Sequence, residues 1–500
     1  MADINALPAE INVISLNCWG LKYLAKFRQE RLTEIGKTLA ASDPVPHIIG
    51  LQECWTQQDY QSIRKATRHI LPYGKFYYSG IFGGGLAILS RWPIEESSMI
   101  RYPLNGRPTA FFRGDWFVGK GIACASIRIG PGKKDIVDVF TTHLHAPYER
   151  EPHDSYICHR TAQAWEIAKY MRAAAERGHL VVALGDFNMI PLSLAHRLIS
   201  THAPVRDVWR VLHPDSSIGA AVDEAEKTRR RPDPTAEFNL VENGATCDSV
   251  LNTWRWNKGQ QKRLGPNKPA IEIPSDTIDC NAKRLDYIFA NTGISSDDRK
   301  GAWVVKRAKV GMTERHPVLQ CSLSDHFSVE TTIMRYTGPF DEDTEASSQT
   351  SKHTGASPEG RLASGTDPLN YASQIKDAEE QGTLLPVSTY DEILAMVDKY
   401  TLRERKQRRY RLYHFLCSLI VSIGCLIAVW WSPRNFVAFL LMLLSSLGLS
   451  AGVIDGLIGG LFVGSEIRSL KEFEWEIRNA RAAAGGGGEG GGDYEAIKDW

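Results

Sequence analysis

The chain has 500 residues, of which 43% are hydrophobic and 23% are charged. This composition excludes a disordered chain, and the length exceeds what one hydrophobic core usually supports. The formal net charge of +1 gives no overall attraction to nucleic acid, so we expect no nucleic-acid partner.

Nine cysteines are scattered along the chain without CxxC or Cys/His ligand spacing. This pattern predicts reduced thiols in the cytosol rather than a disulfide framework or a structural zinc site. The N-terminal segment MADINALPAEINVISL lacks the charged region and the long apolar core of a signal peptide. We therefore expect the first domain to be cytosolic.

Residues 10–336 alternate short apolar segments with amphipathic segments, which predicts an α/β domain. Several apolar segments are continuous, as in strands that are buried on both faces. The predicted strands lie at 11–19, 47–55, 86–94, 136–144, 179–188 and 284–291, and the predicted helices at 27–41, 57–69, 158–177 and 192–200. Two polar stretches, 213–240 and 255–280, are expected to be surface insertions.

The composition changes after Tyr336. Residues 337–387 are mostly polar and bury too little apolar surface to fold, so they predict a flexible linker. Residues 388–411 begin with Ser388 and Thr389 ahead of acidic residues, which indicates the start of a helix. The end of this helix is strongly basic.

Residues 412–464 predict two transmembrane helices, at 412–431 and 436–456. Each is long enough to cross about 30 Å of hydrocarbon at a rise of about 1.5 Å per residue. The connection 432–435 is short, so the two helices should form a hairpin with both ends on one side of the membrane. The remaining residues, 465–500, predict a tail that is rich in glycine near its end.

A basic cluster precedes the first apolar helix, and the positive-inside tendency places it in the cytosol. Both termini are then cytosolic, and the endoplasmic reticulum and the mitochondrial outer membrane are both compatible with this topology. The cluster also predicts binding of anionic phospholipids. Its members are Arg403, Arg405, Lys406, Arg408, Arg409 and Arg411.

The second apolar helix carries a glycine at every fourth position from Gly448 to Gly464. Such a stripe lets another helix approach closely, either the first helix or that of a second chain in a homodimer. Asp455 is costly in a bilayer, so we expect it to be buried against a partner or close to the headgroups.

Polar residues recur where the predicted strands end, which is where α/β sheets place their ligands. They are Asn17, Glu53, His143, Asp186, Asn188, Asp286, Asp325 and His326. Any one of them alone has an ordinary structural explanation as a turn residue or a satisfied hydrogen-bonding group. Their repetition predicts an active site.

Residue chemistry suggests a role for each of these side chains. Asn17, Glu53 and Asp325 offer hard oxygen atoms, which suit Mg²⁺ rather than zinc. Asp286 could orient His326 as a general base that deprotonates water.

The remaining three residues are expected to act on the water and the phosphate. Asp186 and Asn188 are placed to position the water and to hydrogen-bond a phosphoryl oxygen. A protonated His143 could stabilise the developing negative charge.

The ordered motifs SLN, LQE, AILSRWP, TTHLHA, GDFN, LDYIF and SDH resemble the endonuclease/exonuclease/phosphatase superfamily. Within it, the chain is most similar to neutral sphingomyelinases and fungal inositol phosphosphingolipid phospholipase C enzymes, over residues 10–336 and the C-terminal apolar helices. This resemblance implies a four-layer α/β/β/α sandwich with Mg²⁺ at Glu53, close to Asn17 and Asp325. It also implies hydrolysis of a membrane sphingolipid to ceramide and a phosphorylated headgroup, with sphingomyelin and inositol phosphosphingolipids both open as substrates.

The segment DWFVGKG contains Asp115 and Lys120. In the sphingomyelinase branch, a similar pair is implicated in switching the site between inactive and active arrangements. Without the resemblance, the pair would be interpreted as part of an exposed turn.

Two other functions remain open. One is a different phosphoesterase of the same superfamily, such as a phosphoinositide phosphatase or a nuclease. The other is a non-catalytic membrane scaffold.

Overall fold

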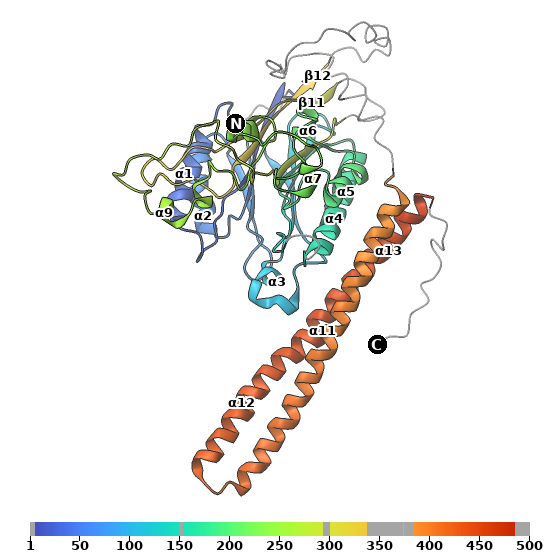
Figure 1. The fold of residues 1–500 in the computed structure, drawn as a ribbon. Helices are drawn as coiled ribbons and strands as arrows, with labels where there is room; N and C mark the ends of the chain where they lie inside the picture. Colours follow the sequence, from blue (N-terminus) through green and yellow to red (C-terminus); the bar gives the residue numbers. More distant parts are fainter. Residues whose placement is uncertain (1–5, 150–153, 294–300, 338–373, 375–383, 486–500) are drawn as a thin grey trace. The chain divides into compact units, whose positions relative to one another are not determined.

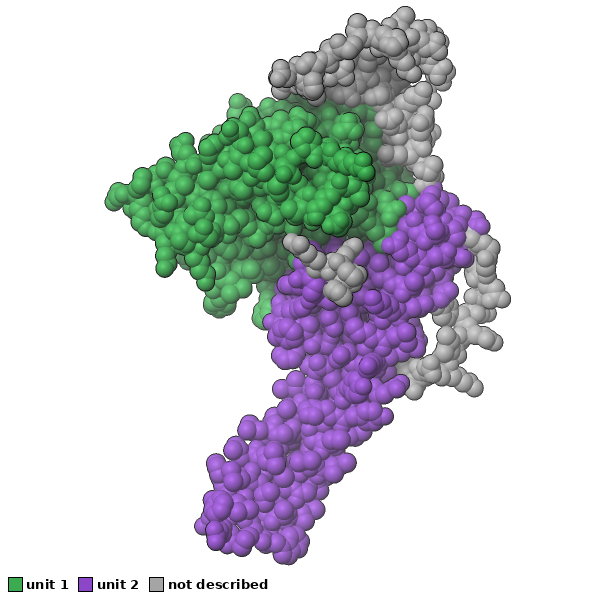
Figure 2. All heavy atoms as spheres, in the orientation of Figure 1, with its two compact units in different colours: residues 1–101, 120–146, 163–383 green, residues 102–119, 147–162, 384–500 purple. Residues whose placement is uncertain are grey.

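The structure is a computed structural model that describes residues 6–149, 154–293, 301–337, 374 and 384–485. The chain divides into two compact units, which are coloured separately in Figure 2. The first unit comprises residues 1–101, 120–146 and 163–383, and the second comprises residues 102–119, 147–162 and 384–500.

Two six-stranded sheets form the centre of the first unit. One contains β1 (Glu10–Asn17), β2 (Ile48–Gln52), β3 (Tyr73–Tyr77), β4 (Leu86–Ser90), β11 (Ala302–Gly311) and β12 (Ser328–Tyr336), in the order β11-β12-β1-β2-β4-β3. The other contains β5 (Ile94–Arg101), β6 (Gly121–Arg128), β7 (Ile136–His143), β8 (Leu180–Asp186), β9 (Arg206–Asp207) and β10 (Asp286–Ala290), in the order β5-β6-β7-β8-β10-β9.

Helices cover the outer faces of both sheets (Figure 1). The first sheet is covered by α1 (Arg28–Ala40) and α2 (Gln57–Thr67), and the second by α5 (Leu194–His202) and much of α4 (Ile157–Glu176). The inner faces of the sheets share one apolar core, to which Val13, Val139 and Ile288 belong. This arrangement confirms the four-layer α/β/β/α sandwich. All nine cysteines are free, as expected.

The expected strand at 86–94 is divided between the two sheets. β4 ends at Ser90, and β5 begins at Ile94 in the other sheet. Pro93 lies between them, and proline cannot donate a hydrogen bond within a sheet. The pattern IEESSMIR of β5 is too polar to predict a strand, because β5 is an edge strand with half its surface in water.

The two polar stretches expected at the surface are folded segments with short helices. Among these are α7 (Glu224–Lys227), α8 (Ala236–Val241) and α9 (Lys258–Gln261). The buried Asp279 anchors them: its carboxylate accepts a hydrogen bond from Ser249 over 2.8 Å, and its backbone carbonyl accepts one from the Asn239 amide over 2.6 Å.

The second unit is built around long helices. The basic segment and the first apolar segment form one continuous helix, α11 (Val387–Ala428), followed by a short 3₁₀ turn (Val429–Trp431). The second apolar segment is α12 (Asn435–Leu457), which continues through a π-helical turn (Ile458–Phe462) into α13 (Val463–Ala483). Most of α13 lies in the segment 465–500, which was predicted to be a tail. Most of the expected linker and the glycine-rich end fall outside the described residues.

Two of the helical segments, Val387–Trp431 and Asn435–Ala483, are long and apolar enough to cross a membrane. Most of the side chains in their apolar parts are exposed, whereas a core helix of a soluble protein buries them. The two helices could therefore span a membrane as a hairpin.

α11 and α12 pack closely where two glycines of α12 face α11. A Cβ atom at Gly452 would lie 2.4 Å from Cβ of Ser418, and one at Gly456 would lie 2.9 Å from the ring of Phe415. In contrast, Gly448 has no atom near such a position. The expected glycine stripe is therefore a contact surface only in part. One helical turn has 3.6 residues, so glycines spaced four residues apart do not all face the same side of the helix.

Polar groups also join the helices of the hairpin. The carboxylate of Asp455 forms an ion pair with Arg411 and lies 2.8 Å from Nδ1 of His414. The hydroxyl groups of Ser422 and Ser445 lie 2.7 Å apart, within hydrogen-bonding distance. Asp455 is thus half-buried, with its polar partners on α11 of the same chain.

The second unit also contains two segments from the first 162 residues of the chain. One includes a 3₁₀ helix (Pro108–Arg113) and α3 (Asp115–Val118). The ring of Trp116 lies 4.4 Å from that of Phe462, tilted by 31°, and Tyr400 donates a hydrogen bond to the carbonyl of Ser155. Segments distant in sequence are therefore packed onto the C-terminal helices.

Candidate active site

Strand register brings the expected site residues together. Asn17 ends β1, His143 ends β7 and Asp186 ends β8. His143 pairs with Asp186 across the parallel β7–β8 ladder, and Asp286 lies opposite Asp186 on the antiparallel β10. These side chains therefore gather at one edge of the sheets, as the sequence predicts.

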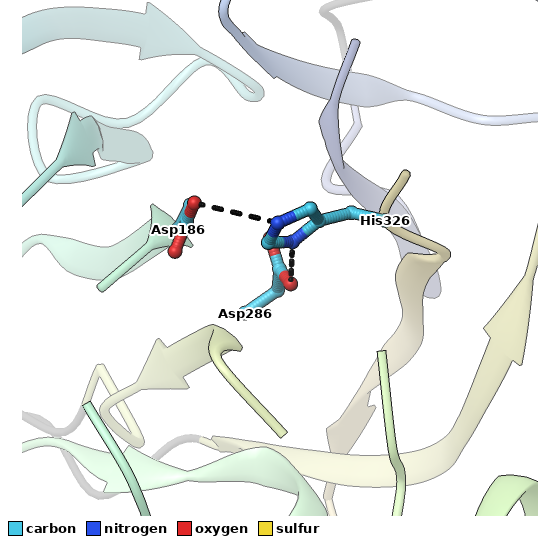
Figure 3. Close-up of side chains that lie close together, drawn as sticks. All are labelled: Asp186, Asp286 and His326. Carbon is cyan, nitrogen blue, oxygen red and sulfur yellow. Dashed lines mark hydrogen bonds and ion pairs between the residues drawn. The ribbon is translucent and has the colours of Figure 1, made fainter. Parts of the chain in front are cut away.

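His326 forms a dyad with Asp286, which Figure 3 shows beside Asp186. Nδ1 of His326 lies 2.8 Å from Oδ2 of Asp286, within hydrogen-bonding distance. Nε2 faces Oδ2 of Asp186 at 4.0 Å, beyond hydrogen-bonding distance. One ring nitrogen is thus held by a carboxylate while the other faces the site, which is the arrangement that a general base requires.

Electrostatics favour proton uptake by this histidine. Burial lowers the pKa of His326, but the carboxylates of Asp286 and Asp186 outweigh it and raise the pKa well above its usual range. Burial and the charge of Asp286 also raise the pKa of Asp186. These carboxylates therefore favour the protonated imidazole, and a cation bound nearby would be needed to lower the pKa of His326 for action as a general base.

Glu53 and Asn17 form the other half of the site. The Asn17 amide donates hydrogen bonds to Oε1 of Glu53 over 3.2 Å and to Oδ2 of Asp186 over 3.0 Å. The second carboxylate oxygen of Glu53, Oε2, is buried and has no hydrogen-bond partner among the described residues. Burying a carboxylate oxygen without a partner is costly, so this atom fits a bound cation.

The charge around Glu53 also fits a cation. Loss of contact with water, followed by the negative charge of Asp325, raises the pKa of Glu53. A divalent cation held by Asn17, Glu53 and Asp325 would offset the repulsion between the two carboxylates.

A second set, Asp186, Asp286 and His326, also has ligand atoms within 4.8 Å of one another. Oδ2 of Asp286 accepts a hydrogen bond from Thr246 and lies 2.8 Å from Nδ1 of His326, whereas its Oδ1 is buried without a partner among the described residues. The described residues therefore offer two candidate positions for a cation, one on the Glu53 side and one at Asp186, Asp286 and His326.

Two site residues have left-handed backbone conformations. Glu53 has φ of 51°, which is strained for a glutamate, and Asn188 has φ of 46°, which asparagine adopts more readily. Hydrogen bonds hold both in place: the Gly20 amide donates to the Glu53 carbonyl over 3.0 Å, and the Asn188 side chain donates to the Leu144 carbonyl over 3.1 Å.

His143 lies 3.5 Å from Asp186 through Nε2, as a member of the same site. Burial and the positive charges of Lys120 and His326 lower its pKa well below the usual range. The neutral imidazole is therefore favoured, and the protonated His143 expected from the sequence is not supported.

The proposed switch residues lie in different compact units. Asp115 is buried at the first residue of α3. Lys120 is buried in the first unit, where its ammonium group donates to the carbonyl oxygens of His143 and Leu144 over 3.3 and 3.2 Å. Neither side chain belongs to an exposed turn.

Thr246, which was not predicted as a site residue, holds the dyad in place. Its hydroxyl donates to Oδ2 of Asp286 over 2.6 Å, and the Leu285 amide donates to the hydroxyl over 3.2 Å. Thr246 lies between the two polar stretches, 40 residues from Asp286 in sequence. No motif around it could have revealed this contact.

The supporting role of Arg31 was not predicted from the sequence either. This fully buried side chain donates to the carbonyls of Trp19 over 2.8 Å and of Leu323 over 2.7 Å. It thereby ties the loop after Asn17 to the loop that carries Asp325. Its place in an ordinary amphipathic helix gave no sign of this role.

The members of the basic cluster of α11 differ in their exposure and in their ion pairs. Arg403 donates to Glu404 over 2.8 Å, and Arg411 pairs with Asp455, so both are engaged within the second unit. Lys406 and Arg409 are exposed. These two are the members best placed to meet an anionic surface.

The fold and the site indicate one class of protein, and comparison with a family model identifies the same class. Residues 14–326 match the model described as the endonuclease/exonuclease/phosphatase family. The chain therefore belongs to this family.

Several relatives are similar over nearly the whole chain. The chain is 36% identical to an inositol phosphosphingolipids phospholipase C of Schizosaccharomyces pombe, over 94% of each chain. It is 30% identical to the protein of the same name from Saccharomyces cerevisiae, over 96% of this chain and 92% of the relative. A putative neutral sphingomyelinase of Caenorhabditis elegans is 33% identical over 58% of this chain and 60% of its own length. The chain is accordingly an enzyme of the phosphodiesterase class.

Proposed function

We propose that the protein is a Mg²⁺-dependent phospholipase C that hydrolyses sphingolipids at the cytosolic face of a membrane. The substrate class is supported by the names of relatives that match over almost the whole chain. The single observation that carries the chemistry is the His326–Asp286 pair, 2.8 Å apart, beside the unpartnered carboxylate oxygen of Glu53.

In the proposed reaction, Nε2 of His326 takes a proton from water while the water oxygen attacks phosphorus. The bond between phosphorus and the ceramide oxygen breaks, and that oxygen takes up a proton from solvent, to which the imidazolium of His326 later returns its own. Asp286 fixes the imidazole and stabilises its positive charge. Asn188 and a neutral His143 can donate hydrogen bonds to phosphoryl oxygens.

A cation held by Asn17, Glu53 and Asp325 would neutralise charge on the phosphate. The raised pKa of Glu53 shows how poorly the surroundings otherwise tolerate its negative charge.

The test uses the purified full-length protein in vesicles that contain sphingomyelin, inositol phosphoceramide or a phosphoinositide. We expect Mg²⁺-dependent release of ceramide from one or both sphingolipids. Release of inorganic phosphate from the phosphoinositide, without ceramide, would identify a different phosphoesterase. Absence of turnover on every lipid would favour the non-catalytic scaffold.

The membrane arrangement forms part of the proposal. The hairpin anchors the enzyme with both termini in the cytosol, and Lys406 and Arg409 of α11 meet anionic phospholipids. Asp115 and Lys120 act as a switch that regulates the site. Replacing both Lys406 and Arg409 by Gln should weaken binding to anionic vesicles, and unchanged binding would contradict this role.

A further inference from the structure

Large apolar side chains are exposed on two loops of the first unit. The structure describes every residue from 6 to 101, and seven large hydrophobic side chains are exposed in this stretch. Val45 is separated from the other six in sequence. We name the other six residues the apolar rim. These six are Tyr23 (88% exposed), Leu24 (75%), Phe27 (50%), Tyr78 (67%), Ile81 (74%) and Phe82 (61%). Such clustering is typical of an interaction surface.

Strand directions place both loops at the edge where Glu53 lies. β1 and β2 are parallel, so the loop after Asn17 leaves the sheet at the same edge as the loop after Gln52. β4 is antiparallel to both β2 and β3, so the connection from β3 to β4 also lies at this edge. Val45 lies at the opposite edge, before β2 begins.

Backbone hydrogen bonds join both loops to the candidate metal ligand. The Gly20 amide donates to the Glu53 carbonyl over 3.0 Å, and the Cys54 amide donates to the Gly85 carbonyl over 3.0 Å. Glu53 and Cys54 thus lie between the two loops. The apolar rim therefore borders the point at which a substrate phosphate would approach Glu53.

The charge of the rim fits a lipid surface. Residues 18–27 contain Lys22 and Lys26 but no acidic residue, and residues 78–85 contain no charged residue. The ammonium group of Lys22 lies 5.2 Å from the centre of the Tyr23 ring. Exposed aromatic and aliphatic side chains beside lysines suit the boundary between headgroups and acyl chains.

We propose that the apolar rim inserts into the surface of the bilayer and brings lipid headgroups to Glu53. The choice of a lipid bilayer as the occupant rests on the proposed function. The rim gives the first unit a membrane contact of its own, made by residues outside the C-terminal helices and their basic cluster.

Photo-crosslinking tests this contact without requiring turnover. The full-length protein carries Phe82→p-benzoylphenylalanine or, as a matched control, Val45→p-benzoylphenylalanine, in vesicles of phosphatidylcholine and phosphatidylserine. We expect lipid adducts at position 82 and almost none at position 45. Equal labelling at the two positions, or crosslinks from position 82 to a second copy of the chain, would overturn the proposal.

Kinetics provide a second test. We expect Leu24→Ser combined with Phe82→Ser to lower turnover of a sphingolipid in vesicles by about tenfold or more, because lost apolar contact weakens interfacial binding. Turnover of a water-soluble phosphodiester, and both activities of Val45→Ser, should be unchanged. An equal loss on both substrates would overturn the inference.

The two proposals fail in different ways. If sphingolipids are not the substrate, ceramide is not released but the lipid adducts at position 82 remain. If the rim does not touch lipid, the adducts are lost while ceramide is still released.

Discussion

Glu53 is a carboxylate whose surroundings favour a cation over solvent. One oxygen accepts a hydrogen bond from Asn17, and the other is buried without a partner among the described residues. Asp325 adds negative charge and raises the pKa of Glu53. The electrostatic surroundings of Glu53 therefore favour a bound divalent ion. The sequence motif alone does not reveal these surroundings.

Glu53→Gln keeps the shape of the side chain and removes its charge. We expect the turnover number to fall by about 100-fold or more, and the Mg²⁺ concentration for half-maximal activity to rise, because an anionic ligand is lost. Activity measured across a Mg²⁺ titration checks both effects. Glu96→Gln, at an exposed position on β5, is the control and should retain both values. Unchanged Mg²⁺ dependence in Glu53→Gln would contradict the assignment.

Thr246→Val removes the hydroxyl that donates to Asp286. We expect the turnover number to fall by about tenfold with little change in KM, because the dyad is less well held while substrate contacts remain. Thr246→Ser restores the hydroxyl and should restore most of the activity. Loss of activity in both variants would point to packing of the methyl group instead.

α11 and α12 show how two apolar helices of one chain recognise each other. Their contact combines small residues with a buried serine pair and a half-buried ion pair, rather than apolar side chains alone. In a membrane this is expected, since lipid tails solvate apolar side chains as well as a neighbouring helix does.

Gly452→Val should destabilise the hairpin, because a Cβ atom at this position would lie 2.4 Å from Ser418. We expect a loss of about 1–3 kcal/mol, as in other overpacked interfaces. Thermal unfolding in detergent micelles measures it. Gly448→Val introduces the same side chain into the same helix where nothing lies near, so it controls for helix propensity. Equal unfolding temperatures for the two variants would contradict the packing described.

The second unit joins distant segments around a buried charged cluster. Nε2 of His159 lies 3.1 Å from Oε1 of Glu466 on α13, and Arg107 lies 3.8 Å from Glu404 on α11. Glu404 also pairs with Arg403. Residues from three parts of the chain therefore share one set of buried charges, whose energy depends on pH.

Burial raises the pKa of Glu466 from 4.5 to about 7, although Arg403 and Arg107 oppose this shift. Because the folded-state pKa is higher than the unfolded one, stability from this group is complete below pH 4.5 and is lost as pH rises to about 7. Glu466→Gln cannot ionise, so we expect it to unfold at a higher temperature than the wild type at pH 8, by on the order of 2 kcal/mol in stability.

Thermal unfolding of the full chain from pH 4 to pH 8, in one detergent, measures this difference. Glu472→Gln, exposed on the same helix, should follow the wild type at every pH. If Glu466→Gln also follows the wild type, Glu466 does not carry the pH dependence.

The local pattern of apolar and polar residues was sufficient to predict much of the fold. The strands β2, β4 and β8 are mostly apolar runs because both of their faces are buried, and such runs are visible in sequence. Edge strands such as β3 and β5 have one face in water and no comparable signal. The helix α13 was missed because its charged residues resemble those of a solvated tail.

Residue patterns along the chain are enough to predict the α/β class, the apolar hairpin and the polar residues at strand ends, because burial and helix length produce regular spacing of apolar residues. Three-dimensional contacts are needed to see that Thr246 and Arg31 support the site, that Glu53 has an unpartnered oxygen and that Glu466 is buried among other charges. These properties depend on contacts between residues distant in the chain, and sequence spacing does not encode the distance between such atoms.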